Sequence, residues 1–137
     1  MANKVVAATI VAMMKGDFDL DVVDLRFFAV SSTYTFSAAH DFLDDVTNII
    51  SDVVAATGEA VAAITGGGSF DCADVTITNV NGAAAGIWAY DHTGGADSAR
   101  RLVEWWDTAS GLPTGTLSGG SIPLTINASG LFTVTTA

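Results

Sequence analysis

Three aspartates at alternate positions form the pattern in this chain that most resembles a metal-binding motif: Asp17, Asp19 and Asp21. Carboxylates spaced in this way open the calcium-binding loop of an EF-hand, which also needs glycine at its sixth position and glutamate at its twelfth. Val22 and Phe28 occupy those two positions. The alternation therefore indicates carboxylates on the solvent-facing side of an extended segment rather than an EF-hand.

A second group of carboxylates offers the ligand chemistry of a looser calcium site: Asp41, Asp44 and Asp45. Oxygen ligands from clustered aspartates suit this cation, but no loop motif accompanies them. The calcium site therefore remains an alternative. Our prediction is a protein that needs neither a metal ion nor another cofactor.

The side chains that could act as nucleophiles or bases do not form a recognisable catalytic motif. His40 and His92 are the only histidines, and neither has a cysteine or a second histidine at the spacing of a zinc site. The Gly-x-Ser-x-Gly motif of serine hydrolases does not occur in the chain. Cys72, the single cysteine, excludes an internal disulfide and is expected to be a half-buried, inert thiol. We therefore expect a protein that is not an enzyme.

The tryptophans Trp88, Trp105 and Trp106 are candidates for binding rather than catalysis. Adjacent residues of a strand point to opposite faces, so a strand over residues 101–107 predicts that one of Trp105 and Trp106 is buried and the other points outward. An outward tryptophan is typical of a protein interface or of a platform for a sugar ring. We favour the protein interface, because no second aromatic lies beside it at strand spacing. The alternative is that the N-terminal helix or a loop covers it.

The composition predicts one acidic domain that spans residues 1–137. Fifteen acidic and five basic residues give a net charge of −10, while half of all residues are hydrophobic and the mean hydropathy is +0.45. So few cations argue against a nucleic-acid partner, because phosphate binding needs clustered lysine and arginine. The apolar run Val5–Met14 is too short to cross a bilayer, and no signal-peptide cleavage site follows it, so we expect no membrane contact.

The same N-terminal run has the period of a helix over residues 3–15, with Asn3 as its cap and Gly16 at its end. Its apolar stripe needs a partner surface, so we expect the helix to lie on a sheet. The stripe and the two adjacent tryptophans are our candidate interface residues: Val6, Ile10, Met13, Trp105 and Trp106.

Much of the remaining chain alternates apolar and polar residues with the period of a β-strand. This pattern predicts strands over residues 23–30, 74–80, 85–90, 101–107, 122–127 and 131–136. Residues 49–64 are expected to add two shorter strands, Ile49–Val54 and Glu59–Ile64, although their alanine content would also permit a helix. A short helix is predicted over residues 38–46, with Ser37 as its cap.

Glycine-containing pairs set the predicted turns and connections between these strands. Asn81-Gly82 is read as a turn, and Ser129-Gly130 as the turn of a C-terminal hairpin. The stretch Gly66–Ser69 is read as a flexible connection. The predicted fold is mainly β: a single-domain β-sandwich or barrel-like antiparallel sheet of seven to eight strands, with an N-terminal helix and one short helix.

The order of several short motifs resembles a family of small structural proteins of tailed bacteriophages. The pieces that carry the resemblance are Asp24-Leu-Arg-Phe-Phe-Ala-Val-Ser-Ser-Thr-Tyr-Thr, His40-Asp-Phe-Leu-Asp-Asp-Val, Phe70-Asp-Cys-Ala-Asp-Val-Thr-Ile-Thr, Trp88-Ala-Tyr-Asp-His-Thr-Gly, Arg101-Leu-Val-Glu-Trp, Gly111-Leu-Pro and Ile122 to Val134. They extend over nearly the whole chain. One departure is the Ala-rich strand Glu59–Ile64, where the family tends to carry an aromatic residue.

The resemblance implies a non-enzymatic virion component, made in the host cytoplasm and located in the particle. We expect a capsid decoration, or cement, protein whose partners are the major capsid protein or other virion proteins and further copies of itself. A tail- or neck-associated structural or receptor-binding module is the alternative.

Overall fold

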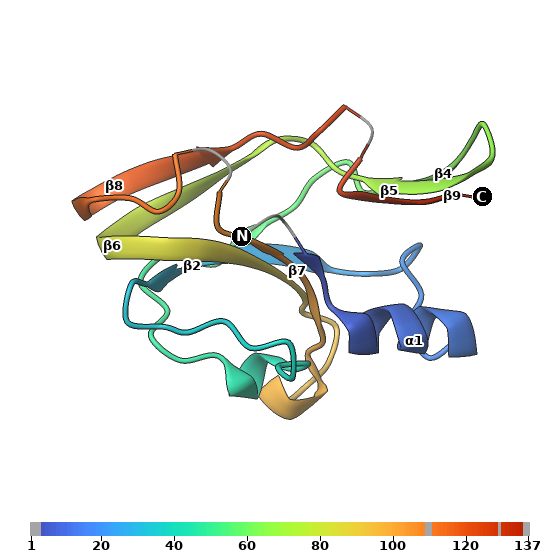
Figure 1. The fold of residues 1–137 in the computed structure, drawn as a ribbon, viewed down its shortest axis with the longest axis horizontal. Coiled ribbons are helices and arrows are strands. Elements are labelled where there is room, and N and C mark those ends of the chain that lie inside the picture. The colour runs from blue at the N-terminus through green and yellow to red at the C-terminus, as the bar shows by residue number, and fades with distance from the viewer. Residues whose placement is uncertain (1–3, 109–110, 129, 136–137) are drawn as a thin grey trace.

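The computed structural model describes residues 4–108, 111–128 and 130–135. Over these residues the chain forms two antiparallel sheets, of six and three strands, and one α-helix (Figure 1). The predicted mainly β, sandwich-like fold is confirmed. The described residues form nine strands rather than seven or eight. Two of the nine are only two residues long, too short to leave an alternating pattern in the sequence.

The larger sheet has five strands in one path and a sixth strand beside it. Its strands, in spatial order, are β1 (Lys4–Val5), β7 (Leu102–Trp106), β6 (Val75–Asp91), β2 (Leu25–Ser31) and β3 (Val54–Ala55). The sixth strand, β8 (Thr116–Leu124), pairs with the first half of β6 (Figure 1). The second half of β6 pairs with β2 and β7, so one long strand belongs to both layers of the sandwich.

The predicted turn at Asn81-Gly82 is wrong, because β6 runs through both residues without reversing. The pairing of β6 with β8 shifts register twice between Ile77 and Asn81, and Asn79 and Gly82 both have positive φ. These irregularities bend the strand instead of ending it, as β-bulges do. The Oδ1 atom of Asn81 accepts the backbone N–H of Gly119 at 2.9 Å and ties the bend to β8.

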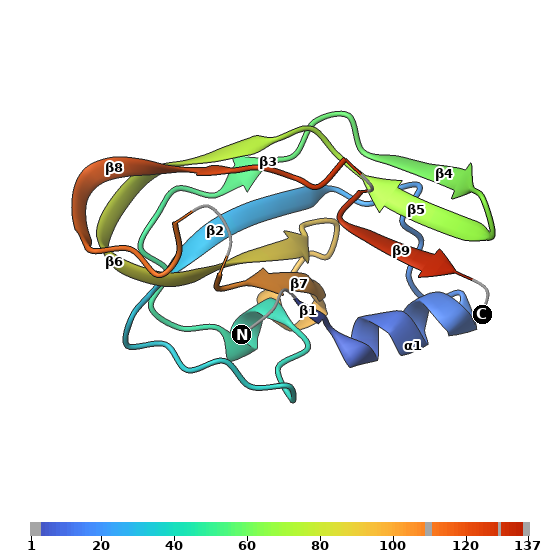
Figure 2. The ribbon, with the colours of Figure 1, turned by 45° about the horizontal axis from the view of Figure 1, so that its top comes forward.

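The smaller sheet has the order β4 (Ala60–Ile64), β5 (Gly67–Asp71), β9 (Phe132–Thr135), as Figure 2 shows. The predicted strand Glu59–Ile64 is confirmed as β4, with Glu59 just outside it. The stretch Gly66–Ser69 is not a flexible connection: Thr65 and Gly66 form a tight turn, and Gly67–Ser69 belong to β5. The predicted C-terminal hairpin is wrong, because β8 pairs with β6 whereas β9 pairs with β5. Ser129 of its predicted turn lies outside the described residues.

The single α-helix, α1 (Ala7–Lys15), begins later than predicted because Lys4–Val5 forms strand β1 and Val6 is extended. Asn3, the predicted cap, lies outside the described residues. Gly16 ends the helix in the left-handed conformation, as expected. The predicted stripe is buried only in part. Val6 is 6% exposed and Met13 packs against the main core, but Ile10 is 41% exposed. Within the helix, Thr9 and Ala12 form the buried face.

The predicted short helix over residues 38–46 is also wrong. Only the three-residue 3-10 helix η1 (Leu43–Asp45) forms there, and a second one, η2 (Asp97–Ala99), lies beside it. The Oδ2 atom of Asp45 accepts the backbone N–H of Asp41 at 3.0 Å and of Phe42 at 3.3 Å, which closes a tight turn. These two bonds lower the pKa of Asp45. The local side chain therefore competes with helical hydrogen bonding.

Both faces of the larger sheet are buried along β2, β7 and the second half of β6. The face toward β8 and the smaller sheet carries Leu25, Phe27 and Ala29 of β2, which belong to the main core. The opposite face carries Phe28 and Val30, which the segment of residues 32–46 covers. A sheet covered on both sides has buried residues at every strand position instead of alternate ones. All five residues of β7 are accordingly buried.

Candidate interaction surface

Neither Trp105 nor Trp106 is exposed, so the prediction that one of them points outward is wrong. Their exposed fractions are 2% and 4%. The two side chains do point to opposite faces of β7, as strand geometry requires. Trp106 enters the main core and lies 5.8 Å from Phe27 between ring centroids, whereas Trp105 enters the second core. The alternative of a covered tryptophan is therefore the one observed.

The cover over Trp105 is an aromatic cluster that the loop after β2 supplies. Phe36 stacks against Trp88 and Trp105, with ring centroids 5.8 and 5.7 Å apart. Tyr34 lies 5.6 Å from Trp105 and its hydroxyl accepts the Nε1–H of Trp88 at 3.2 Å. Gly86 makes room on the same strand as Trp88, because a Cβ there would lie 2.4 Å from the Trp105 ring. These contacts make both tryptophans part of the fold rather than of a binding surface.

Each histidine is held by a tyrosine, a pairing that the sequence analysis missed. The Tyr34 hydroxyl, which accepts from Trp88, also forms a hydrogen bond with Nδ1 of His40 at 2.7 Å. The hydroxyl of Tyr90 lies 2.9 Å from Nδ1 of His92. Burial raises the pKa of Tyr34 and of Tyr90, so both hydroxyls stay protonated at neutral pH. The two histidines therefore have structural partners at Nδ1.

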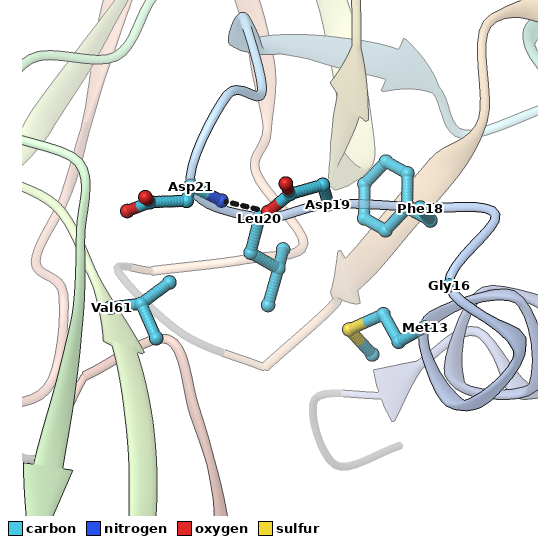
Figure 3. A pocket seen from close by; sticks show the side chains of 7 residues that line it. All are labelled: Met13, Gly16, Phe18, Asp19, Leu20, Asp21 and Val61. Atoms are coloured by element: carbon cyan, nitrogen blue, oxygen red, sulfur yellow. Dashed lines mark hydrogen bonds between the residues drawn. The ribbon is translucent and has the colours of Figure 1, made fainter.

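The carboxylates of the two predicted acidic groups are not brought together around a common point. Among the described residues, no group of three or more His, Cys, Asp and Glu side chains could hold a metal ion. Asp17, Asp19 and Asp21 lie on the loop after α1 rather than on a strand. Asp19 accepts the backbone N–H of Asp21 at 2.9 Å (Figure 3). No helix within the described residues is long and apolar enough to span a bilayer.

The best candidate for a binding site is a groove between α1 and the smaller sheet, which we call the α1 groove. A cavity of about 660 Å³ lies there, and its lining comes from the helix end, the following loop and β4: Met13, Gly16, Phe18, Asp19, Leu20, Asp21 and Val61. Figure 3 shows Met13, Leu20 and Val61 converging from these three elements. A second cavity of about 150 Å³ shares the same three side chains and continues to Phe132 and Val134 of β9.

The walls of the α1 groove are incompletely covered. Strand register places Val61 and Phe132 on the same inner face of the smaller sheet as Phe70. Phe70 is 1% exposed, but Val61 is 50% exposed and Val134 is 67% exposed. Large apolar side chains on the surface of an acidic molecule are typical of a contact with another protein. Of the predicted interface residues, Met13 is the one that lines this groove.

Two buried titratable groups, Cys72 and Glu104, face the main core. Burial raises the pKa of Cys72 to about 12, so the thiol is not ionised at neutral pH, and its 6% exposure makes it fully rather than half buried. Glu104 is 3% exposed on β7, and burial raises the pKa of its carboxyl to about 8. Its Oε2 atom has no hydrogen-bond partner among the described residues. The carboxyl is therefore held neutral at pH 7.

Comparison of the chain with protein-family models, with curated proteins and with solved structures finds no match in any of the three.

Proposed function

We propose that this protein is a non-enzymatic structural component of a tailed-bacteriophage particle, namely a capsid decoration protein that binds the shell through the α1 groove. The proposal takes the virion role from the resemblance of the sequence motifs. It takes the contact surface from the groove. The major capsid protein is the proposed partner, and the location is the assembled virion.

The observation that carries the proposal is the exposure of apolar side chains around the α1 groove. Val61 and Val134 remain half exposed or more beside a cavity large enough for several side chains of a partner. An interface of this kind gains most of its binding free energy from a few apolar anchors in such a hollow. The net charge of −10 fits a protein on the outer surface, away from packaged DNA.

The buried tryptophans bear on the alternative of a receptor-binding module. A sugar-stacking platform needs an exposed aromatic face. Trp88, Trp105 and Trp106 are all 4% exposed or less. Decoration through the α1 groove is therefore the function we favour.

A re-decoration experiment tests this proposal. Particles that lack the protein are mixed with purified chain, and the bound amount is measured after sedimentation. The Val134→Asp substitution, at the rim of the groove, should weaken binding about tenfold or more, because it places a charge in the apolar contact.

The matched control is Val22→Asp, the same change at a residue of similar exposure, 70% against 67%, that lines neither cavity. It should bind as the wild-type chain does. Equal binding by both variants would contradict attachment through the groove. Failure of the wild-type chain to bind such particles would contradict the decoration function itself.

A further inference from the structure

The outer edge of β4 is an unpaired strand. Within the described residues β4 pairs only with β5, on one side, and all five of its residues are exposed. In an antiparallel strand, backbone N–H and C=O groups of alternate residues point toward the free side. Figure 2 shows β4 at the edge of the smaller sheet, where these groups form a ready template for a strand of another chain.

The free edge of β4 lacks the protections that isolated edges usually carry. Its sequence, Ala-Val-Ala-Ala-Ile, contains no charge and no proline, and its ladder with β5 has no register shift. The other described edges differ. β1 and β3 are two residues long, and β8 contains Pro123 and a shifted register. β9, the other edge of the small sheet, ends at the last described residue.

We propose that two copies of this chain pair through β4, antiparallel and about a two-fold axis at Ala62. The strand order of the joined sheet is then β9-β5-β4 of one copy followed by β4-β5-β9 of the other. A two-fold contact uses the same surface on both copies, as most homodimers do. The proposal concerns the isolated protein and stands whether or not the chain decorates a capsid.

The placement of charge favours antiparallel over parallel pairing of the two β4 strands. Glu59 precedes β4, and Asp71 lies opposite Ala60 on β5, so both acids stand at one end of the strand. With Ala62 opposite its own copy, Glu59 faces Thr65 of the partner subunit. The two Glu59 residues are then about 20 Å apart along the strands, beyond the screening length of about 8 Å in physiological salt. Parallel pairing in register would instead place them side by side.

The side chains on the two sides of this axis are complementary in size, because each large residue faces a small one. On the inner face, Val61 would lie opposite the partner's Ala63, and on the outer face Ile64 would lie opposite the partner's Ala60. Small and large residues in opposite positions pack without a gap. The pairing would cover Ile64, now 39% exposed.

Sedimentation of the full chain over a concentration series tests the proposal. The wild-type protein should reach twice its 14.0 kDa mass. Ala62→Lys, which places two lysines opposite each other on the axis, should raise the dissociation constant about tenfold or more. Thr133→Lys is the matched control, because it adds the same charge to the same outer face on β9, and it should leave the dimer intact.

A mixture of charge variants tests the register. Ala62→Lys and Ala62→Glu should each be monomeric alone and should form a heterodimer when mixed, with circular dichroism spectra equal to that of the wild type. A wild-type chain that stays monomeric up to about 1 mM would overturn the proposal. The β4 edge would then be a binding site for a strand of another protein. Loss of the dimer in Thr133→Lys but not in Ala62→Lys, or no heterodimer in the mixture, would also overturn it.

Discussion

At the scale of the residue, the most unusual side chain is Glu104. A carboxyl in the main core is stable only when neutral, because ionisation without a partner charge is costly there. The carboxyl shares its face of the sheet with Ala89, directly opposite on β6. Once ionised above its own pKa, Glu104 also adds to the effect of burial in raising the pKa of Cys72. Glu104 therefore links the stability of the fold to pH.

We expect the Glu104→Gln variant to reveal this link. The ordinary pKa of the carboxyl is 4.5 and the folded value is about 8, so between these values the unfolded chain releases a proton that the folded chain keeps. The contribution of the neutral carboxyl to the free energy of unfolding is fully present below pH 4.5 and is lost as the pH rises to 8. Between pH 4.5 and 8, the free energy of unfolding of the wild type should fall by about 1.4 kcal/mol per pH unit relative to that of the variant.

Urea denaturation of both proteins from pH 4 to 9 measures the difference, and charges elsewhere cancel in the comparison. A constant difference between wild type and Glu104→Gln over this range would contradict the buried neutral carboxyl.

At the scale of the element, the anchoring of α1 decides whether the α1 groove keeps its shape. Thr9 is fully buried, and its hydroxyl donates a hydrogen bond to the backbone carbonyl of Leu102 on β7. β1, which directly precedes the helix, pairs with the same strand, so α1 is attached to β7 at two points. Met13, one turn further along, is thereby held in the wall of the groove.

The Thr9→Val substitution should lower the free energy of unfolding by about 1–3 kcal/mol, although valine has nearly the same shape. It leaves a buried carbonyl without its partner. Thermal or urea denaturation measures the loss, and Thr47→Val, the same change at an exposed residue, is the control. Equal stability of the two variants would argue against the hydrogen bond as the anchor of α1.

The elements also show how far the sequence could predict this fold. The alternation Leu25, Phe27, Ala29 was enough to predict β2 and one of its buried faces, whereas the alternation Ile122, Leu124, Ile126 predicted only the last three residues of β8, which runs from Thr116 to Leu124. Pairing was not predictable, because β8 and β9 follow each other in the chain yet join different sheets. The turn at Asn81-Gly82 failed because the same residue types also form a bulge within a continuous strand.

The candidate site was less predictable than the fold. Trp105 and Trp106 seemed suited to an interface because a strand was assumed to have one solvent-facing side. Phe36 and Tyr34, far from them in sequence, provide the cover that removes that side. The exposure of Val61 follows from its position in a small sheet with free edges, and nothing in a single sequence specifies a free edge.

At the scale of the whole molecule, the β4 edge and the inner face of the small sheet carry no charge, whereas Asp19 and Asp21 border the α1 groove on its loop side. The chain carries a net charge of −10, yet β4 contains no charged residue and the inner face of the small sheet is apolar. Such a distribution keeps single copies soluble and restricts close contact to a few surfaces. We infer that the α1 groove and the β4 edge are these surfaces, one for the shell and one for a second copy.

The most direct test of the central claim is to locate the protein on purified virions. Antibodies raised against the full chain would be gold-labelled, applied to intact particles and imaged by electron microscopy. The account predicts regular labelling of the head surface. Labelling confined to the tail or neck, or no labelling of particles whose other structural proteins are present, would contradict it.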